Sequence, residues 1–163
     1  MTKMEKVLIE IEMENGEVMK GELYPEVAPI TVDNFLKLID EDFFAGLIFH
    51  RVIPGFMIQG GGYDKDLHEK RCASIKGEFA SNGVKNDLKH TEGVLSMART
   101  MVKNSASSQF FIMHKPAPHL DGDYAAFGKI TDGLDIVDRI ACTPTNFQDM
   151  PLQPVVIKTI RRV

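Results

Sequence analysis

An arginine, a glutamine and several large apolar residues lie close together in one segment, which reads FHRVIPGFMIQGGG. In an extended chain Met57 and Gln59 point to the same face, and a turn at Pro54-Gly55 would bring Arg51 alongside them. A guanidinium stays charged at every relevant pH. Its rigid fork of donors lets one N–H reach a developing lone pair while others hold neighbouring oxygens. Spacing alone, however, favours a solvated arginine beside core residues.

A second stretch places Gln109 beside Phe110-Phe111, directly after a small polar loop that begins at Ser105. Taken alone, this stretch predicts a strand with its turn. The two stretches become informative only together.

Three other patterns suggest chemistry but lack the residues that it needs. Gly60-Gly61-Gly62 is followed by no Lys-Ser/Thr pair and no helix start, so a bulge or turn is predicted rather than a phosphate loop. The five histidines form no i, i+4 pair and have no coupled cysteine, so no metal site is predicted. Ser107 and Ser108 lack the G-x-S-x-G context of a hydrolase triad.

The elements that must position these side chains are mostly strands. Residues 4–23 alternate apolar and polar side chains around Asn15-Gly16, which predicts a β-hairpin with a type I′ turn. A helix of about three turns is predicted after Pro29, because apolar residues recur there at i, i+3, i+4 and i+7. These residues are Val32, Phe35, Leu36 and Ile39.

A shorter helix is predicted over 133–141, and the remaining apolar runs are short and separated by turn residues. This spacing favours an antiparallel barrel or sandwich, and a closed barrel has the advantage that it removes exposed strand edges. The predicted strands cover residues 47–53, 56–59, 93–98, 109–113, 125–130 and 155–163.

Length and composition restrict the class of protein. A chain of 163 residues predicts one domain, residues 1–163, with a core large enough to fold alone. Its 19 basic and 23 acidic residues give a net charge of −4, which argues against nucleic-acid binding. The longest apolar stretch is far shorter than the ~20 residues that span a bilayer. We therefore expect no membrane segment.

The N-terminal residues and the cysteines predict a cytoplasmic location. Alternating apolar and acidic residues stand where an export signal would have an apolar core. Cys72 and Cys142 lie far apart in the sequence and form no CxxC motif, so they are expected to be free thiols without a disulfide.

Taken together, the two stretches and three further blocks resemble the cyclophilin family of peptidyl-prolyl cis-trans isomerases, over nearly the whole chain. The likeness is greatest to the small single-domain bacterial cytoplasmic branch. The blocks are Phe49-His50-Arg51, Pro54-Gly55-Phe56-Met57 with Gln59-Gly60-Gly61, Leu95-Ser96-Met97-Ala98, Ser108-Gln109-Phe110-Phe111-Ile112, and Leu120-Asp121-Gly122 leading to Phe127-Gly128-Lys129.

This resemblance implies a mostly β fold, a closed eight-stranded antiparallel β-barrel capped by two α-helices, with a substrate groove outside one wall. It implies that Arg51 is the catalytic residue and that Gln59 orients Arg51 or the substrate carbonyl. The implied proline pocket consists of Phe56, Met57, Phe111 and Leu120. The implied peptide-holding residues are Gln59, Gln109 and the backbone of Ala98, Arg99 and Thr100.

Two positions depart from the best-known eukaryotic pattern at the rim of the groove. His119 stands where that pattern has Trp, and Tyr124 stands where it has His. We therefore expect weak binding of cyclosporin-type inhibitors and unimpaired catalysis. The implied partners are proline-containing peptides and unfolded or folding proteins, acted on by a monomer without cofactor or metal.

Two other function classes stay open at this point. A non-catalytic module on the same barrel could bind proline-containing peptides as a scaffold or chaperone, although the presence of Arg51 and Gln59 weighs against it. A ligand carrier would need a hollow barrel, whereas the abundance of Phe, Ile, Val and Leu suggests a filled one.

Overall fold

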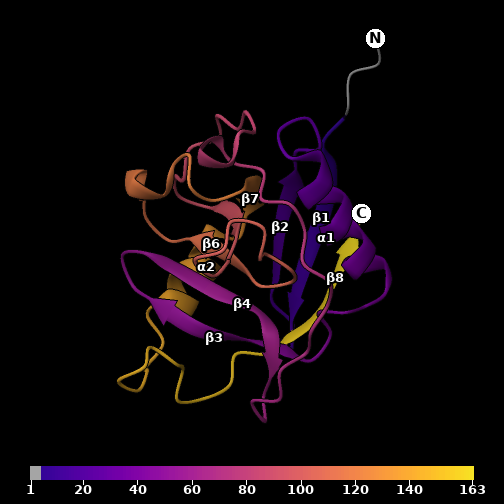
Figure 1. The fold of residues 1–163 in the computed structure, drawn as a ribbon. Helices are drawn as coiled ribbons and strands as arrows, with labels where there is room; N and C mark the ends of the chain where they lie inside the picture. Colours follow the sequence, from indigo (N-terminus) through magenta and orange to yellow (C-terminus); the bar gives the residue numbers. More distant parts are fainter. Residues whose placement is uncertain (1–4) are drawn as a thin grey trace.

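The computed structural model describes residues 5–163, which form one eight-stranded antiparallel sheet curled into a nearly closed barrel (Figure 1). The strand order is β3-β4-β6-β5-β7-β2-β1-β8. The strands are β1 (Val7–Met13), β2 (Val18–Leu23), β3 (Leu47–Ile53), β4 (Met57–Asp64), β5 (Val94–Met97), β6 (Phe110–Met113), β7 (Ala126–Asp132) and β8 (Ile157–Arg162).

The two end strands of this order, β3 and β8, meet and close most of the ring. Ile48 and Val156 form an antiparallel bridge. Beside it, the Phe49 N–H donates to the carbonyl of Val155 at 3.0 Å, and the Gly46 N–H donates to that of Ile157 at 2.8 Å. The predicted antiparallel barrel is confirmed.

The hairpin of β1 and β2 is confirmed, but its predicted type I′ turn is wrong. Such a turn needs a positive φ at both central residues, whereas Gly16 has a φ of 94° and Asn15 is not among the residues with positive φ. The Gly16 N–H donates to Met13 O at 2.9 Å, and the Met13 N–H donates to Glu17 O at 2.7 Å. The loop is therefore the longer form that ends in a glycine bulge. The side-chain oxygen Oδ1 of Asn15 accepts the Glu17 N–H at 3.0 Å, which holds this form.

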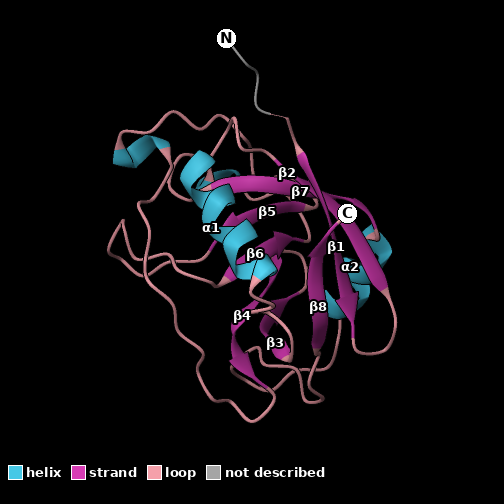
Figure 2. Cartoon of the chain, turned by 90° about the vertical axis from the view of Figure 1, so that its right-hand side faces the viewer, coloured by secondary structure: helices cyan, strands magenta, loops and turns pink. Residues whose placement is uncertain are grey.

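Two α-helices, α1 (Pro29–Asp40) and α2 (Leu134–Ala141), lie on different sides of the barrel (Figure 2). Both match the predicted ranges closely. Pro29 occupies the first turn of α1, where its missing N–H costs no hydrogen bond. Two single-turn 3-10 helices, η1 (Ala80–Asn82) and η2 (Pro118–Leu120), complete the described elements.

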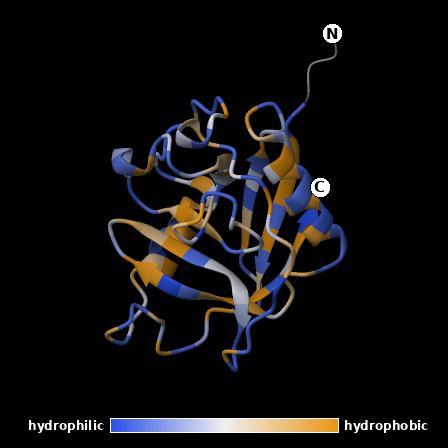
Figure 3. Cartoon of the chain, viewed as in Figure 1, coloured by the Kyte–Doolittle hydropathy of each residue, from blue (hydrophilic) through white to orange (hydrophobic). Residues whose placement is uncertain are grey.

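Aromatic rings from α1 and three other parts of the chain fill the barrel. The Phe35 ring of α1 lies 5.0 Å from Phe44, 5.3 Å from Phe110 and 5.0 Å from Phe127, centroid to centroid. All four rings are at most 1% exposed, and fully burying one such side chain contributes about 1.5–3 kcal/mol. Figure 3 shows hydrophobic stretches along the strands and helices, interrupted by hydrophilic residues. A filled interior speaks against the carrier hypothesis.

A second, smaller apolar cluster lies on the outside of the wall made by β4, β6, β5 and β7. Side chains alternate along a strand, so Phe110 and Ile112 enter the main core while Phe111 and Met113 join the outer cluster. The buried members of the outer cluster are Met57, Val94, Phe111, Met113, Ala117, Leu120 and Ala126. This alternation is what presents an apolar surface outside a filled barrel.

Gly60, Gly61 and Gly62 lie inside β4, which is longer than predicted, and the expected bulge is there. The register between β3 and β4 shifts on both sides of Phe49. Gly61 has a φ of 91°, and a Cβ on it would lie 2.8 Å from the Ser108 carbonyl oxygen. Only glycine fits this position without strain.

The helices and the cysteines bear on two further predictions, the absence of a membrane segment and of a disulfide. None of the described helices is long and apolar enough to cross a membrane. Cys72 is half-buried, Cys142 is exposed, and both are free thiols.

We predict that Gly61→Ala destabilises the fold more than Gly16→Ala. Both residues have a positive φ, which costs an alanine about 1–2 kcal/mol, but a Cβ on Gly16 would meet nothing within 4 Å. The contact with the Ser108 carbonyl should bring the loss for Gly61→Ala to about 3 kcal/mol. Urea unfolding measures both free energies, and equal losses would contradict the close approach as its cause.

Candidate active site

A surface pocket of about 170 Å³ opens on the outer apolar cluster. Strands β3, β4 and β6, the chain after β5, and the segment around η2 supply its lining. The lining residues are Arg51, Phe56, Met57, Gln59, Ala98, Arg99, Phe111, Leu120 and Tyr124. All nine are among the residues singled out from the sequence, and they come from four separate stretches of the chain.

The β3–β4 hairpin places a cation beside the apolar floor. Arg51 lies opposite Gln59 in the register. The turn between them has Gly55 at a φ of 82°, and the Phe56 N–H donates to Ile53 O at 3.0 Å. The expectation that a turn at Pro54-Gly55 brings Arg51 alongside Gln59 is confirmed. The Arg51 side chain is exposed, so its donors can reach a molecule in the pocket.

Gln59 of the pocket lining is joined side chain to side chain to Gln109, which lies outside that lining. The Gln59 amide nitrogen donates to the Gln109 oxygen at 3.0 Å. Gly62 makes room for this pair, because a Cβ on Gly62 would lie 2.5 Å from the Gln109 side chain. The bond fixes the orientation of the Gln59 amide, which lies opposite Arg51 in the register.

The floor of the pocket is apolar and closely packed. Met57 is 2% exposed, Phe111 5% and Leu120 7%. At the rim, the Phe111 ring meets Tyr124 edge to face at 5.9 Å, and Phe56 lies 5.9 Å from the His119 ring. The two departures from the eukaryotic pattern therefore border the floor without forming it.

Arg99 links the segment after β5 to the loop that follows η2. Its guanidinium donates to the Asp123 carbonyl at 2.7 and 3.1 Å and to the Thr100 carbonyl at 3.0 Å. The same group stacks over the rings of Tyr124 and Phe79, 4.8 and 4.7 Å from their centroids. With its donors on backbone oxygens, Arg99 shapes the wall of the pocket.

Ala98 and Thr100 differ in position although they are close in sequence. The Ala98 N–H donates to the Gln109 carbonyl at 3.0 Å, which extends the wall. The Thr100 N–H and hydroxyl both donate to the Ser105 hydroxyl at 2.9 Å. Thr100 lines a neighbouring, more open hollow together with Met101 and Lys103. A peptide-holding role for Thr100 stays a prediction.

His50, the neighbour of Arg51, is neutral. Burial, with the Arg51 charge as a second cause, lowers the pKa of His50 to about 4. Its ring lies 4.9 Å from Tyr63, edge to face. At neutral pH the positive charge at this point of β3 therefore belongs to Arg51 alone.

Sequence reasoning missed a buried histidine directly behind the pocket. His90 is 1% exposed and bonds Asp121 on one side and Ser96 on the other. The available signal was Ser96 itself, a polar residue in the middle of the apolar run that forms β5.

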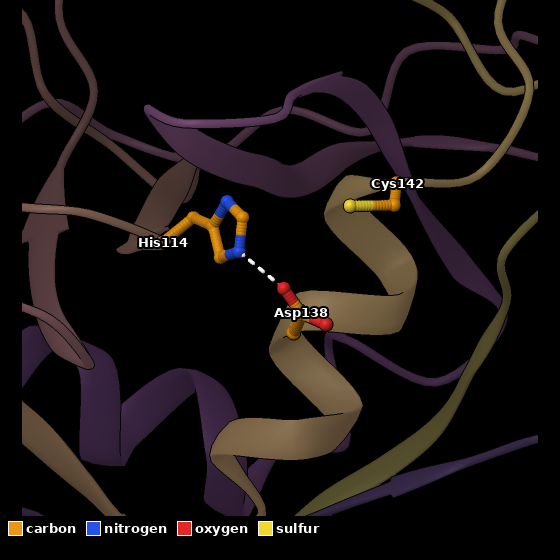
Figure 4. Close-up of side chains that lie close together, drawn as sticks. All are labelled: His114, Asp138 and Cys142. Carbon is orange, nitrogen blue, oxygen red and sulfur yellow. Dashed lines mark hydrogen bonds and ion pairs between the residues drawn. The ribbon is translucent and has the colours of Figure 1, made fainter.

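The argument that no histidine has a coupled cysteine is wrong for His114. Figure 4 shows His114, Asp138 and Cys142 close together, and their ligand atoms lie within 4.8 Å of one another. Asp138 and Cys142 share one face of the chain at α2 and its end, while His114 follows β6. The fold, not the spacing, creates this cluster.

Hydrogen-bond directions argue against a metal at this cluster. The Gly55 N–H donates to His114 Nδ1 at 2.8 Å, so the neutral ring carries its proton on Nε2, which lies 2.6 Å from the Asp138 carboxylate. A metal on Nε2 would need that proton on Nδ1, facing the Gly55 N–H. His114 instead supports the turn next to Phe56.

Comparisons with known proteins agree with this geometry. Residues 8–162 match the family model described as cyclophilin type peptidyl-prolyl cis-trans isomerase/CLD. A peptidyl-prolyl cis-trans isomerase of Acinetobacter baylyi is 47% identical over 150 residues, which cover 86% of this chain and 77% of that protein. Peptidyl-prolyl cis-trans isomerase B of Bacillus subtilis is 45% identical over 129 residues, 79% of this chain and 87% of that protein.

Solved structures show the same likeness. A cyclophilin type peptidyl-prolyl cis-trans isomerase of Cryptosporidium parvum covers 98% of this chain and 98% of its own, with a TM-score of 0.83 and 29% identity. The same protein in the presence of the dipeptide Ala-Pro gives a TM-score of 0.81 with 30% identity, covering 96% of this chain and 98% of that one. With a family model that spans nearly all of its residues and a barrel of the same build, this chain belongs to the cyclophilin-type peptidyl-prolyl cis-trans isomerases.

Proposed function

We propose that the pocket beside Arg51 accelerates rotation about X–Pro bonds in peptides and folding proteins. In this proposal the apolar floor of Met57, Phe111 and Leu120, with Phe56 beside it, holds the proline ring. Arg51 then stabilises the twisted amide. The observation that carries the proposal is the β3–β4 register, which sets a cation immediately beside an apolar pocket.

The energetic demand of this reaction is modest. An X–Pro bond isomerises over a barrier of ~18–20 kcal/mol because rotation destroys amide resonance. Acceleration by about four decades needs about 5.4 kcal/mol of selective transition-state stabilisation. No bond breaks, so a few fixed contacts suffice and neither a nucleophile nor a cofactor is required.

Arg51 is suited to the selective part of this stabilisation. As the amide twists, the proline nitrogen becomes pyramidal and gains a lone pair that is absent in the planar ground state. A guanidinium donor aimed at this nitrogen binds the transition state better than the substrate. Because His50 is neutral, no second cation on the same strand competes for this role.

The remaining pocket residues hold the peptide on either side of the rotating bond. We infer that Gln59, fixed by Gln109, orients Arg51 or the substrate carbonyl. In this proposal the backbone from Ala98 to Thr100 also holds the peptide chain, with groups other than the N–H groups of Ala98 and Thr100, which donate to Gln109 and Ser105. The X side chain points to the open groove, so we expect a loose preference for X.

Support for proline-containing partners comes from a relative. The Cryptosporidium parvum structure was determined in the presence of Ala-Pro, a dipeptide that carries the recognised ring. The rival hypothesis is a non-catalytic peptide-binding module, in which Arg51 would only bind the peptide. Turnover of an X–Pro peptide separates the two.

We predict that Arg51→Ala lowers turnover far more than affinity. The variant removes the donor aimed at the proline nitrogen but keeps the apolar floor. Loss of one charged hydrogen bond made in the transition state costs about 3–4 kcal/mol, or about two to three decades in rate. Arg51→Lys should restore little, because an ammonium lacks the planar fork.

NMR line shapes on an Ala-Pro peptide report affinity and bound-state interconversion separately. A hundredfold loss of affinity for Arg51→Ala with a wild-type interconversion rate would make Arg51 a binding residue and overturn this mechanism.

We predict that Phe111→Ala weakens affinity and rate together. The ring supplies the floor of the pocket, and removing it forfeits about 1.5–3 kcal/mol of apolar contact, roughly ten- to a hundredfold in affinity. Met101→Ala is the matched control, since Met101 is apolar but 95% exposed and outside the pocket. The same NMR titration measures both variants, and wild-type affinity for Phe111→Ala would exclude the floor as the proline site.

We predict that His119→Trp tightens the binding of cyclosporin-type inhibitors and leaves peptide turnover similar. An indole adds apolar area at the rim next to Phe56. An imidazole instead carries a polar N–H that finds no hydrogen-bond partner on an apolar ligand. Calorimetry on the two proteins decides the matter. Equal affinities would show that the rim does not set inhibitor binding.

A further inference from the structure

The His90 ring is buried beside the Phe111 ring and is not part of the pocket lining. The two rings are stacked with centroids 6.0 Å apart and planes 20° apart. Phe111 therefore has a nearly parallel His90 ring on one side and a nearly perpendicular Tyr124 ring 5.9 Å away. The position of the pocket floor depends on what holds the His90 ring.

Two hydrogen bonds hold that ring, and their directions can be assigned. Nδ1 lies 2.9 Å from an Asp121 carboxylate oxygen, which only accepts, so Nδ1 carries the proton. Nε2 lies 2.8 Å from the Ser96 hydroxyl and therefore accepts its hydrogen. Burial lowers the pKa of His90 although Asp121 opposes this, which keeps the ring in this neutral form.

The two partners of His90 belong to the two walls of the pocket. Ser96 is paired with Phe111 in the β5–β6 register. Asp121 directly follows Leu120 at the end of η2. The backbone of His90 adds two bonds to this second wall, from its own N–H to Asp121 at 2.7 Å and from the Ala117 N–H to the His90 carbonyl at 2.9 Å.

We propose that His90 is a positioning residue for the isomerisation, which sets the orientation of Phe111 and its spacing from Leu120. The proposal rests on the proposed function of the pocket. His90 itself acts only through the floor and never touches the substrate. A displacement of the floor by a fraction of an ångström changes how the proline ring sits against Arg51, and misplacement on this scale costs rate.

The test is a double-mutant cycle between His90→Asn and Phe111→Leu. Asparagine keeps a donor near the place of Nδ1 but removes the ring behind Phe111 and the bond to Ser96. In the wild-type background we expect the bound-state interconversion rate to fall about tenfold. In the Phe111→Leu background the same change should cost less than about twofold, because the ring through which His90 acts is absent.

Thr31→Val is the matched control for general loss of stability. Thr31 lies on α1, outside the pocket lining, and its buried hydroxyl donates to the Glu78 carboxylate at 2.8 Å. This variant should lower the unfolding free energy, leave the rate unchanged, and combine additively with Phe111→Leu. If His90→Asn does not fold, Ser96→Ala replaces it in the cycle, since it removes one bond to His90 and keeps the ring.

The outcomes separate the inference from the proposed function. If wild type is active and Arg51→Ala behaves as expected, but the losses for His90→Asn and Phe111→Leu multiply, the positioning role is wrong and the proposed function stands. A wild-type rate for His90→Asn would also overturn the positioning role. Absence of isomerase activity in the wild-type protein would overturn both.

Discussion

The alternation of side chains along β6 is the constraint on which the rest of the structure depends. Phe110 is fully buried and packs against the rings of Phe35, Phe44 and Phe49. This packing fixes which face of β6 points inward. Phe111 must then point outward, where it becomes the floor of the pocket. A shift by one residue would exchange core and pocket, so the same packing energy that stabilises the barrel also places the site.

The proposed site lies on the outer wall of a filled barrel, which suits a reaction that needs shape rather than reactive groups. The pocket residues on β3, β4 and β6 are anchored by strands whose other side chains enter the core. Arg99 and His90 bind the less regular segments around Tyr124 and Leu120 to that frame. The pocket opens on the surface, yet its floor residues are nearly as buried as those of the core.

Most elements could be predicted from the sequence because their patterns are local. The β3 range, both helices and the turn at Pro54-Gly55 follow from spacing and turn residues. The Asn15-Gly16 turn was mistaken because a second loop form also uses that pair, and the Asn15 side chain decides between them. The length of β4 was missed because glycines, which usually end strands, allow two segments to approach closely here.

The pocket could be predicted residue by residue only through the family resemblance, since spacing alone left Arg51 as a solvated side chain. No local sequence pattern predicts the hydrogen-bonded pairs that lie behind the pocket lining. His90 meets Asp121, and His114 meets Asp138, across 31 and 24 residues of sequence. Such pairs depend on the path of the chain through space, which periodicity does not encode.

The closure of the barrel by its last strand has a consequence for how the chain folds. Strand β8 lies between β1 and β3, and its Arg162 pairs with Ile9 from the other end of the sequence. Arg161 adds side-chain bonds to Glu10 and Glu12 of β1. A ring closed by such distant residues has a high contact order, which slows folding. During synthesis one edge of β1 stays unpaired until β8 has left the ribosome. The protein thus passes through an open stage in which the edge of a strand is exposed.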